Sequence, residues 1–149
     1  NIPSKMHVAN WSTPRLETMK EIMKILCPKA PIEYHHCPEV TVNDNILKKM
    51  KPFSLIVNAT GLGKDRPGSP LSDQCEFPQN SLVWEINYRG DLLFMHQALR
   101  QKEKKNLTVE DGWIYFIHGW TQVIAEVFHI EITENIFHRI ESISNSFRS

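Results

Sequence analysis

The chain has 149 residues, a length that suits one domain and allows about two-thirds of the unfolded surface to be buried on folding. Hydrophobic residues make up 41% and charged residues 23%, as in ordinary globular proteins. The formal net charge is zero, so no basic field attracts nucleic acid or an anionic membrane. No apolar run approaches the roughly 20 residues that cross a bilayer. We therefore expect neither a nucleic-acid partner nor a membrane partner.

The N-terminal residues and the cysteines indicate where the protein works. The opening residues lack the apolar core of a signal peptide and do not begin with methionine, so we expect the sequence to start inside a longer polypeptide. The scattered Cys27, Cys37 and Cys75 form no Cys-x-x-Cys pair, which favours reduced thiols in a cytoplasmic protein. His35 and His36 directly precede Cys37, but neighbours on an extended segment point to opposite faces. We therefore predict no metal site there.

The first part of the chain alternates short strands with helices. Ser12 or Thr13 is a suitable helix cap, because Pro14 follows in the position of the first turn that proline tolerates. Apolar residues at helical spacing then predict one face that lies on a sheet. The predicted elements are a strand at Lys5–Ala9, a helix through Leu26, a strand at Ile32–His35 and a helix at Asn43–Met50.

The segment 55–63, LIVNATGLG, is the centre of the pattern. An apolar run that ends in two glycines predicts a buried parallel strand, at Leu55–Ala59, leading into a tight loop. Asn58 and Thr60 bring donors and acceptors to the end of this strand, where ligands bind in open α/β sheets. From this segment alone, a ligand-binding loop and a plain polar turn stay equally open.

The second part of the chain continues the alternation. The predicted elements are a strand at Leu82–Ile86, a helix from Leu92 through Leu99 with a basic end to Lys105, a strand at Leu107–Val109, a helix from Gly112 through Phe128 and a helix from Thr133 to about Phe147. Strands that alternate with helices indicate βαβ units and a parallel sheet. The predicted fold class is therefore α/β.

Three sequence blocks, in order, resemble the C-terminal, cofactor-binding half of the shikimate/quinate dehydrogenase family. They are LIVNATGLGKDRPGSPL, VWEINYRGDLLFMHQAL and VEDGWIYFIHGWTQVIAEVF. The family shows an Asn-Ala-Thr strand exit, an acidic residue and a tyrosine around the next strand, and an Asp-Gly start to a long helix. The resemblance implies a Rossmann-like parallel sheet with flanking helices over residues 1–128, which binds NADP or NAD. Residues 129–149 would form a C-terminal helix that packs on this domain or on the family's substrate domain.

The resemblance also implies which residues touch the cofactor. Asn10, Ser12 and Arg15 match the family's loop around the adenosine ribose, where arginines pair with a 2′-phosphate. Trp11 replaces the first arginine of that loop, so NADP and NAD both stay open; Trp11 either stacks on adenine or covers the sheet edge. The remaining expected cofactor contacts are Asn58, Ala59 and Thr60 at the nicotinamide ribose, Ile86 at the nicotinamide ring, and Gly112 through its backbone.

The resemblance assigns Tyr88 to the substrate. The family's long helix carries a glutamine that touches the substrate seven residues after the glycine that matches Gly112. Here that position is Gly119, and the nearest glutamine is Gln122, one turn further on. Either the helix start carries an insertion or the substrate contact differs. His118 lies nearby, but a histidine on a helix face is more often structural than an acid or base.

Two parts of the family's pattern lie outside this sequence: the glycine-rich phosphate turn, and the substrate domain with its catalytic lysine and aspartate. We therefore expect no catalytic residue in this chain, and interpret it as the C-terminal portion of an oxidoreductase. The complete protein would pass hydride between NAD(P) and a ring alcohol of a shikimate- or quinate-like acid. The alternative is a non-catalytic module that keeps the fold for nucleotide sensing or interaction.

The expected strand order predicts a further partner. In the doubly wound sheet the first strand lies between the second and the fourth, which here are the strands at 5–9 and 55–59. We expect that first strand to come from the missing N-terminal part of the same protein.

Overall fold

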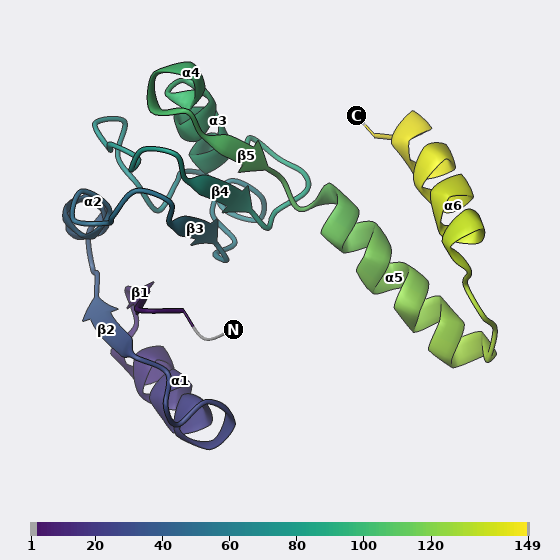
Figure 1. The fold of residues 1–149 in the computed structure, drawn as a ribbon, viewed down its shortest axis with the longest axis horizontal. Coiled ribbons are helices and arrows are strands. Elements are labelled where there is room, and N and C mark those ends of the chain that lie inside the picture. Colours follow the sequence, from purple (N-terminus) through teal and green to yellow (C-terminus); the bar gives the residue numbers. More distant parts are fainter. Residues whose placement is uncertain (1–2, 149) are drawn as a thin grey trace.

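The computed structural model describes residues 3–148, whose strands form two separate parallel sheets (Figure 1). The elements are β1 (Met6–Asn10), α1 (Thr13–Leu26), β2 (Ile32–His36), α2 (Val40–Leu47), β3 (Leu55–Asn58), β4 (Leu82–Glu85), α3 (Leu93–Leu99), α4 (Lys102–Lys105), β5 (Thr108–Glu110), α5 (Trp113–Phe128) and α6 (Glu134–Ser146). The predicted α/β class is confirmed, and the fold is Rossmann-like. No helix within the described range is long and apolar enough to span a bilayer.

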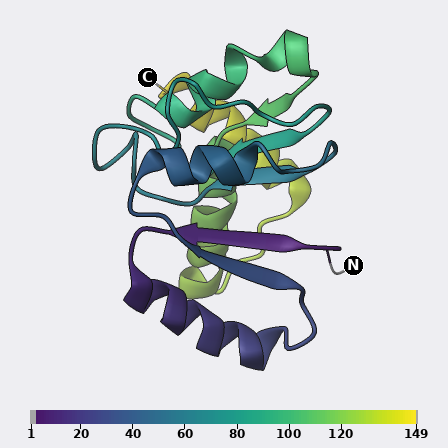
Figure 2. The same cartoon turned by 90° about the vertical axis from the view of Figure 1, so that its left-hand side faces the viewer.

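The first sheet is the parallel pair β1–β2, which α1 connects. Ser12 is the N-cap of α1, but its side chain makes no capping hydrogen bond, so this part of the expected cap is wrong. The Ser12 carbonyl instead accepts a hydrogen bond from the Leu16 amide at 3.2 Å. The Lys20 ammonium lies 5.6 Å from the Tyr34 ring, so α1 covers the face of the pair that carries Tyr34. Figure 2 shows α1 beside this pair, on the side away from the three-stranded sheet.

The second sheet has the order β3-β4-β5, with all strands parallel. Its core lies against α3, where Phe94 packs edge-on against Phe77 with ring centroids 5.8 Å apart. Val83 in the middle of β4 is fully buried, which makes this strand the centre of the core. The buried apolar cluster consists of Leu47, Leu71, Cys75, Phe77, Val83, Phe94, Ala98 and Leu107.

The strand β3 is only half buried, which corrects the expectation of a buried strand. Ile56 packs against the core, whereas Leu55 is 57% exposed and Val57 is 41% exposed. Side chains alternate along a strand, and β3 is an edge strand whose second face is open within residues 3–148. The strand also ends at Asn58, so Ala59 belongs to the loop.

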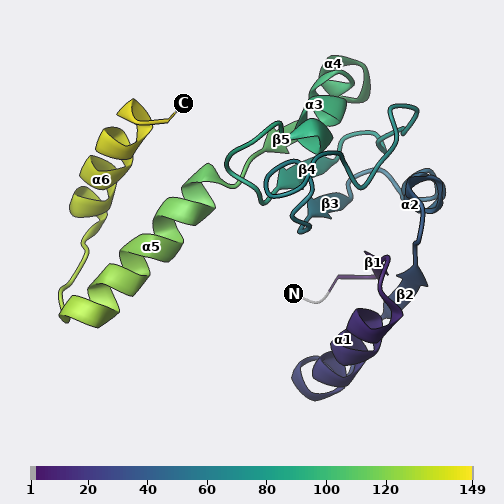
Figure 3. The ribbon, with the colours of Figure 1, turned by 180° about the vertical axis from the view of Figure 1, so that it is seen from behind.

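The two sheets lie with β1 and β3 as their facing edges. In Figure 1 and, from behind, in Figure 3, β1 lies on the side of its pair nearer to the three-stranded sheet. No hydrogen bond of the sheet ladders joins β1 to β3 in the part of the chain described. Direct pairing of these strands would contradict the expected strand order, and the structure agrees with that order on this point.

The C-terminal helices α5 and α6 form a hairpin beyond β5 (Figure 1). As expected, Gly112 precedes α5, and the Thr133 side chain caps α6 by accepting a hydrogen bond from the Ile136 amide. The His118 ring stacks on Phe137 at 3.9 Å between centroids, so this histidine contributes to packing between the two helices.

Two glycines, one directly before α5 and one within it, provide a matched test of how closely the start of α5 packs against the exit of β4. A Cβ atom on Gly112 would lie 1.7 Å from the Ile86 carbonyl oxygen, whereas a Cβ on Gly119 meets nothing within 4 Å. We expect Gly112→Ala to lower the free energy of unfolding by about 1–3 kcal/mol, because the backbone must move. Gly119→Ala should raise it by about 0.4–1 kcal/mol, because alanine loses less entropy in a helix. Urea unfolding measures both, and equal effects would contradict the close approach at Gly112.

Candidate ligand-binding site

A buried carboxylate joins the carboxyl ends of β3 and β4. Glu85 is the last residue of β4 and is 0% exposed. Its Oε2 accepts a hydrogen bond from Asn58 Nδ2 at 2.7 Å, and Asn58 is the last residue of β3. Its Oε1 accepts hydrogen bonds from the backbone amide and from Nδ2 of Asn87, at 3.0 and 2.7 Å. One side chain thus fixes the exits of both strands.

The same network holds the loop that follows β3. Asn58 Oδ1 accepts hydrogen bonds from the Thr60 amide at 3.0 Å and from Thr60 Oγ1 at 2.7 Å. Asn87 Nδ2 also donates to the carbonyl oxygens of Thr60 and Leu62, at 2.9 and 3.2 Å. The loop therefore keeps its shape through buried side chains rather than through regular secondary structure.

Glycines let these loops touch. Gly90 has a φ of +91°, and a Cβ there would lie 2.3 Å from the Gly63 carbonyl oxygen. That carbonyl accepts a hydrogen bond from the Leu92 amide at 3.1 Å, which connects the loop after β3 to the start of α3. The Gly112 amide donates to the Asn87 carbonyl at 3.1 Å. The loop after β3, the exit of β4 and the start of α5 are thereby packed backbone against backbone.

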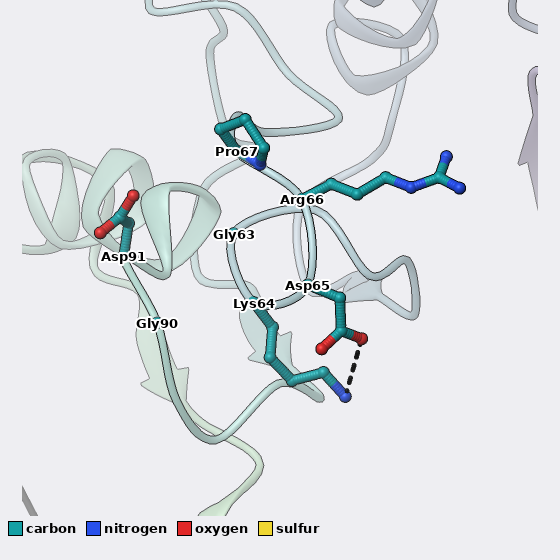
Figure 4. Close-up of a pocket in the computed structure, with 7 residues that line it drawn as sticks. All are labelled: Gly63, Lys64, Asp65, Arg66, Pro67, Gly90 and Asp91. Atoms are coloured by element: carbon teal, nitrogen blue, oxygen red, sulfur yellow. Dashed lines mark ion pairs between the residues drawn. The ribbon is translucent and has the colours of Figure 1, made fainter.

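An open cavity of about 270 Å³ lies beside these loops, lined by residues 63–67 and by Gly90 and Asp91 (Figure 4). Lys64 forms an ion pair with Asp65 at 3.3 Å, and Asp65 also lies 3.3 Å from Arg89. Figure 4 shows the Arg66 side chain directed away from this ion pair. The cavity rim therefore presents two cations, Lys64 and Arg66, together with two carboxylates, Asp65 and Asp91.

Tyr88 stands at the exit of β4, against the first turns of α5. Its ring stacks on Phe116, with centroids 4.0 Å apart and 20° between the planes, and the Lys64 ammonium lies 5.6 Å from the Tyr88 ring. Gln122 is exposed and lies six residues beyond Phe116, about 9 Å further along α5 at 1.5 Å per residue. The structure therefore does not bring Gln122 next to Tyr88.

The loop after β1 carries the other expected cofactor residues. Asn10 Oδ1 accepts a hydrogen bond from the Ser12 amide at 2.8 Å, which fixes the turn. Trp11 is 60% exposed, and the Arg15 guanidinium lies 6.0 Å from the Trp11 ring. The indole and the guanidinium are thus both accessible to a ligand.

The structure brings some of the expected cofactor and substrate residues together and leaves others apart. Thr60 and Ala59 are exposed beside the exit of β4, where Ile86 and Tyr88 lie, while Gly112 is buried behind Ile86.

Sequence reasoning missed the roles of Glu85, Asn87 and Lys64. The available signal was Glu85, a charged residue in the apolar strand LVWEI, followed two residues later by its partner Asn87. Its other partner, Asn58, is 27 residues earlier in the chain, and the sequence does not connect the two. The assignments to cofactor and substrate stay predictions.

A scan against protein-family models and searches among curated proteins and solved structures found no match to this chain. The family resemblance therefore remains an expectation from the sequence motifs.

Glu85→Gln tests the network, with Glu110→Gln, an exposed glutamate at the end of β5, as the matched control. A glutamine amide would face a donor of Asn58 or Asn87, so we expect a loss of about 1–3 kcal/mol in the free energy of unfolding at neutral pH. The control should change little.

The same variant has a signature in pH. Burial raises the pKa of Glu85 above the usual value of a glutamate, and the hydrogen bonds from Asn58 and Asn87 offset part of that rise. Since the folded state then binds the proton more tightly than the unfolded state, Glu85 lowers stability as the pH rises from the usual value to the raised one. Urea unfolding across this range should show that slope in the wild type and not in Glu85→Gln. An unchanged slope would contradict this account of Glu85.

Proposed function

We propose that this chain is the C-terminal portion of a shikimate/quinate dehydrogenase-like oxidoreductase. The complete protein would transfer hydride between NAD(P) and a ring alcohol of a shikimate-type cyclic acid. The observation that carries the proposal is that the exits of β3 and β4 and the start of α5 are joined through Asn87 and Ile86. Thr60, Ile86, Tyr88 and Gly112 all belong to these three segments. The motif resemblance assigns these same residues to the cofactor and the substrate, and such a position at the carboxyl ends of parallel strands is where α/β sheets bind ligands.

The donor set at this cluster fits the nicotinamide end of a dinucleotide. Ala59 and Thr60 are exposed, whereas both polar atoms of the Asn58 side chain are used by Glu85 and Thr60. Asn58 would therefore act by holding Thr60 in place. When bound, the nicotinamide supplies or accepts the hydride, and the chain's own residues would orient it.

The loop after β1 fits the adenosine end. Arg15 is exposed and forms no ion pair within residues 3–148, so its guanidinium is available for a phosphate. The neighbouring Trp11 offers an exposed aromatic face for stacking on a base.

The residues around Tyr88 fit a cyclic carboxylic acid. Stacking on Phe116 holds the Tyr88 ring, so its hydroxyl would meet a substrate in a fixed position. The Lys64 ammonium beside that ring would attract a carboxylate. The proton of the ring alcohol would be handled by an acid/base pair outside this chain.

The open strand edges support a role for more of the same polypeptide. Backbone groups of β1 and β3 that face each other without pairing would each cost on the order of 1–3 kcal/mol if kept from water. A parallel strand inserted between them would pair both edges, and its flanking segments would cover Leu55 and Val57. We propose that the N-terminal part of the protein supplies this strand.

The direct test compares the complete protein with the 149-residue chain. Reduction of NAD and NADP is followed by absorbance with shikimate and with quinate as substrates. We expect turnover with at least one combination in the complete protein, and none from the chain alone. Turnover by the chain alone would contradict the proposal. Nucleotide binding without turnover in the complete protein would favour a non-catalytic sensing or interaction module.

Arg15→Ala tests the adenosine end, with Arg139→Ala, an exposed arginine on α6, as the matched control. If a 2′-phosphate is bound, loss of the charged hydrogen bond should weaken NADP by about 1.5–3 kcal/mol. NAD binding should be unchanged. Titrations of both nucleotides into the complete protein measure this, and equal weakening of NAD and NADP would show that Arg15 does not select the cofactor.

A further inference from the structure

We infer that the β1–β2 pair carries a zinc-binding site formed by His7, Glu33 and His35. His7 lies in β1, while Glu33 and His35 are two residues apart in β2. The parallel register pairs His7 with Glu33 and Ala9 with His35. Residues in register and residues two apart share one face of a sheet, so all three side chains lie on the same face. The inference does not depend on the proposed dehydrogenase function.

The face that carries these residues is accessible. Tyr34 and α1 occupy the opposite face of the pair. The side chains of His7, Glu33 and His35 are 20%, 51% and 27% exposed. A cation can therefore reach the cluster from solvent without opening a core.

The ligand atoms lie within a few tenths of an ångström of the spacing that zinc requires. His7 Nδ1 lies 2.9 Å from His35 Nε2, and Glu33 Oε2 lies 3.5 Å from the first nitrogen and 3.9 Å from the second. Bonds of about 2.0–2.2 Å at tetrahedral angles put ligand atoms roughly 3.3–3.6 Å apart. Of the three observed distances, one lies 0.4 Å below this range, one lies within it and one lies 0.3 Å above it, so side-chain rotations that shift the atoms by a few tenths of an ångström bring all three into the range.

The two imidazoles hold a hydrogen bond where the metal would bind. Their centroids are 5.1 Å apart with 22° between the planes, and the two nitrogens face each other edge to edge. Zinc would replace the proton between His7 and His35, and both rings would turn about their Cβ–Cγ bonds until one nitrogen lone pair of each points at the metal, as Glu33 Oε2 would.

Lys5 orients the carboxylate of Glu33. Its ammonium binds Glu33 Oε1 at 2.7 Å, which leaves Oε2 turned toward the imidazoles. Hydrogen bonding of the second oxygen is the usual arrangement for a carboxylate that ligates a metal. Two histidines, one glutamate and a water molecule in the fourth position make a complete zinc site, and imidazole with carboxylate is a ligand set that zinc favours.

The sequence-based expectation of no metal site concerned His35, His36 and Cys37, which are consecutive in the chain at the end of β2. The structure turns the His36 ring to the Trp11 carbonyl oxygen, at 2.9 Å, away from the cluster. His7 joins His35 across the strands, 28 residues away in sequence.

The experiment titrates zinc into the full-length protein in competition with a chromophoric chelator. We expect one ion per chain in the wild type. His7→Ala and His35→Ala should each weaken binding by more than the roughly 10–100-fold that loss of an outer-shell partner costs. Glu33→Gln keeps the size of the side chain and should also weaken binding. The matched control His36→Ala removes a neighbouring histidine outside the cluster and should bind zinc as the wild type does.

Two further measurements make every outcome decisive. Circular dichroism shows whether each variant keeps its fold; if His7→Ala does not, Glu33→Gln and His35→Ala carry the test. Cobalt substitution should give the strong visible absorption of a tetrahedral site without a thiolate band. The proposal is overturned by no zinc binding in the wild type, by binding that survives loss of the cluster residues, by binding lost in His36→Ala, or by a thiolate band.

Discussion

The carboxylate of Glu85 is the constraint on which the carboxyl edge of the three-stranded sheet depends. Removing a charge from water costs several kcal/mol, and here three hydrogen bonds from Asn58 and Asn87 offset part of that cost. The two asparagines also bond to the loop after β3: Asn58 Oδ1 accepts from Thr60, and Asn87 Nδ2 donates to the Thr60 and Leu62 carbonyls. Through Thr60 and Leu62 that arrangement fixes the loop after β3. The strand exits are therefore preorganised by the protein before any ligand arrives.

The strand β3 and the helix α5 leave large apolar side chains exposed. Leu55 and Val57 lie on the uncovered face of β3, and Trp120, Val127 and Phe128 are 55–68% exposed on α5. Burying such a side chain fully is worth about 1.5–3 kcal/mol. The exposed apolar side chains of β3 and α5 are therefore suited to packing against further protein surface. The unpaired edges of β1 and β3 point to the same conclusion from hydrogen bonding.

The sequence predicted the positions of helices and strands better than the burial of their faces or the contacts between them. The apolar run at 55–58 and the glycine before α5 are local signals, and β3 and α5 appear there. The helix α2 lies three residues earlier than predicted, because Met50 continued the apolar spacing beyond the point where the helix ends. The exposure of Val57 was not predictable, since alternation says which residues share a face but not whether that face is covered. Contacts between strands were also out of reach. Asn58 and Glu85 are 27 residues apart, and only the strand register brings them together.

Polar residues within the strands have two different roles in this protein. Glu85 interrupts an apolar strand, is fully buried and is satisfied by asparagines, so its role is to hold backbone in place. His7 and His35 interrupt β1 and β2 but lie on an accessible face, with nitrogen atoms directed at each other and a carboxylate beside them. The sequence shows all three only as polar residues within strands. Burial separates the two cases: a buried polar group must be matched by the protein, whereas an accessible cluster with spare lone pairs is able to take a ligand from solvent.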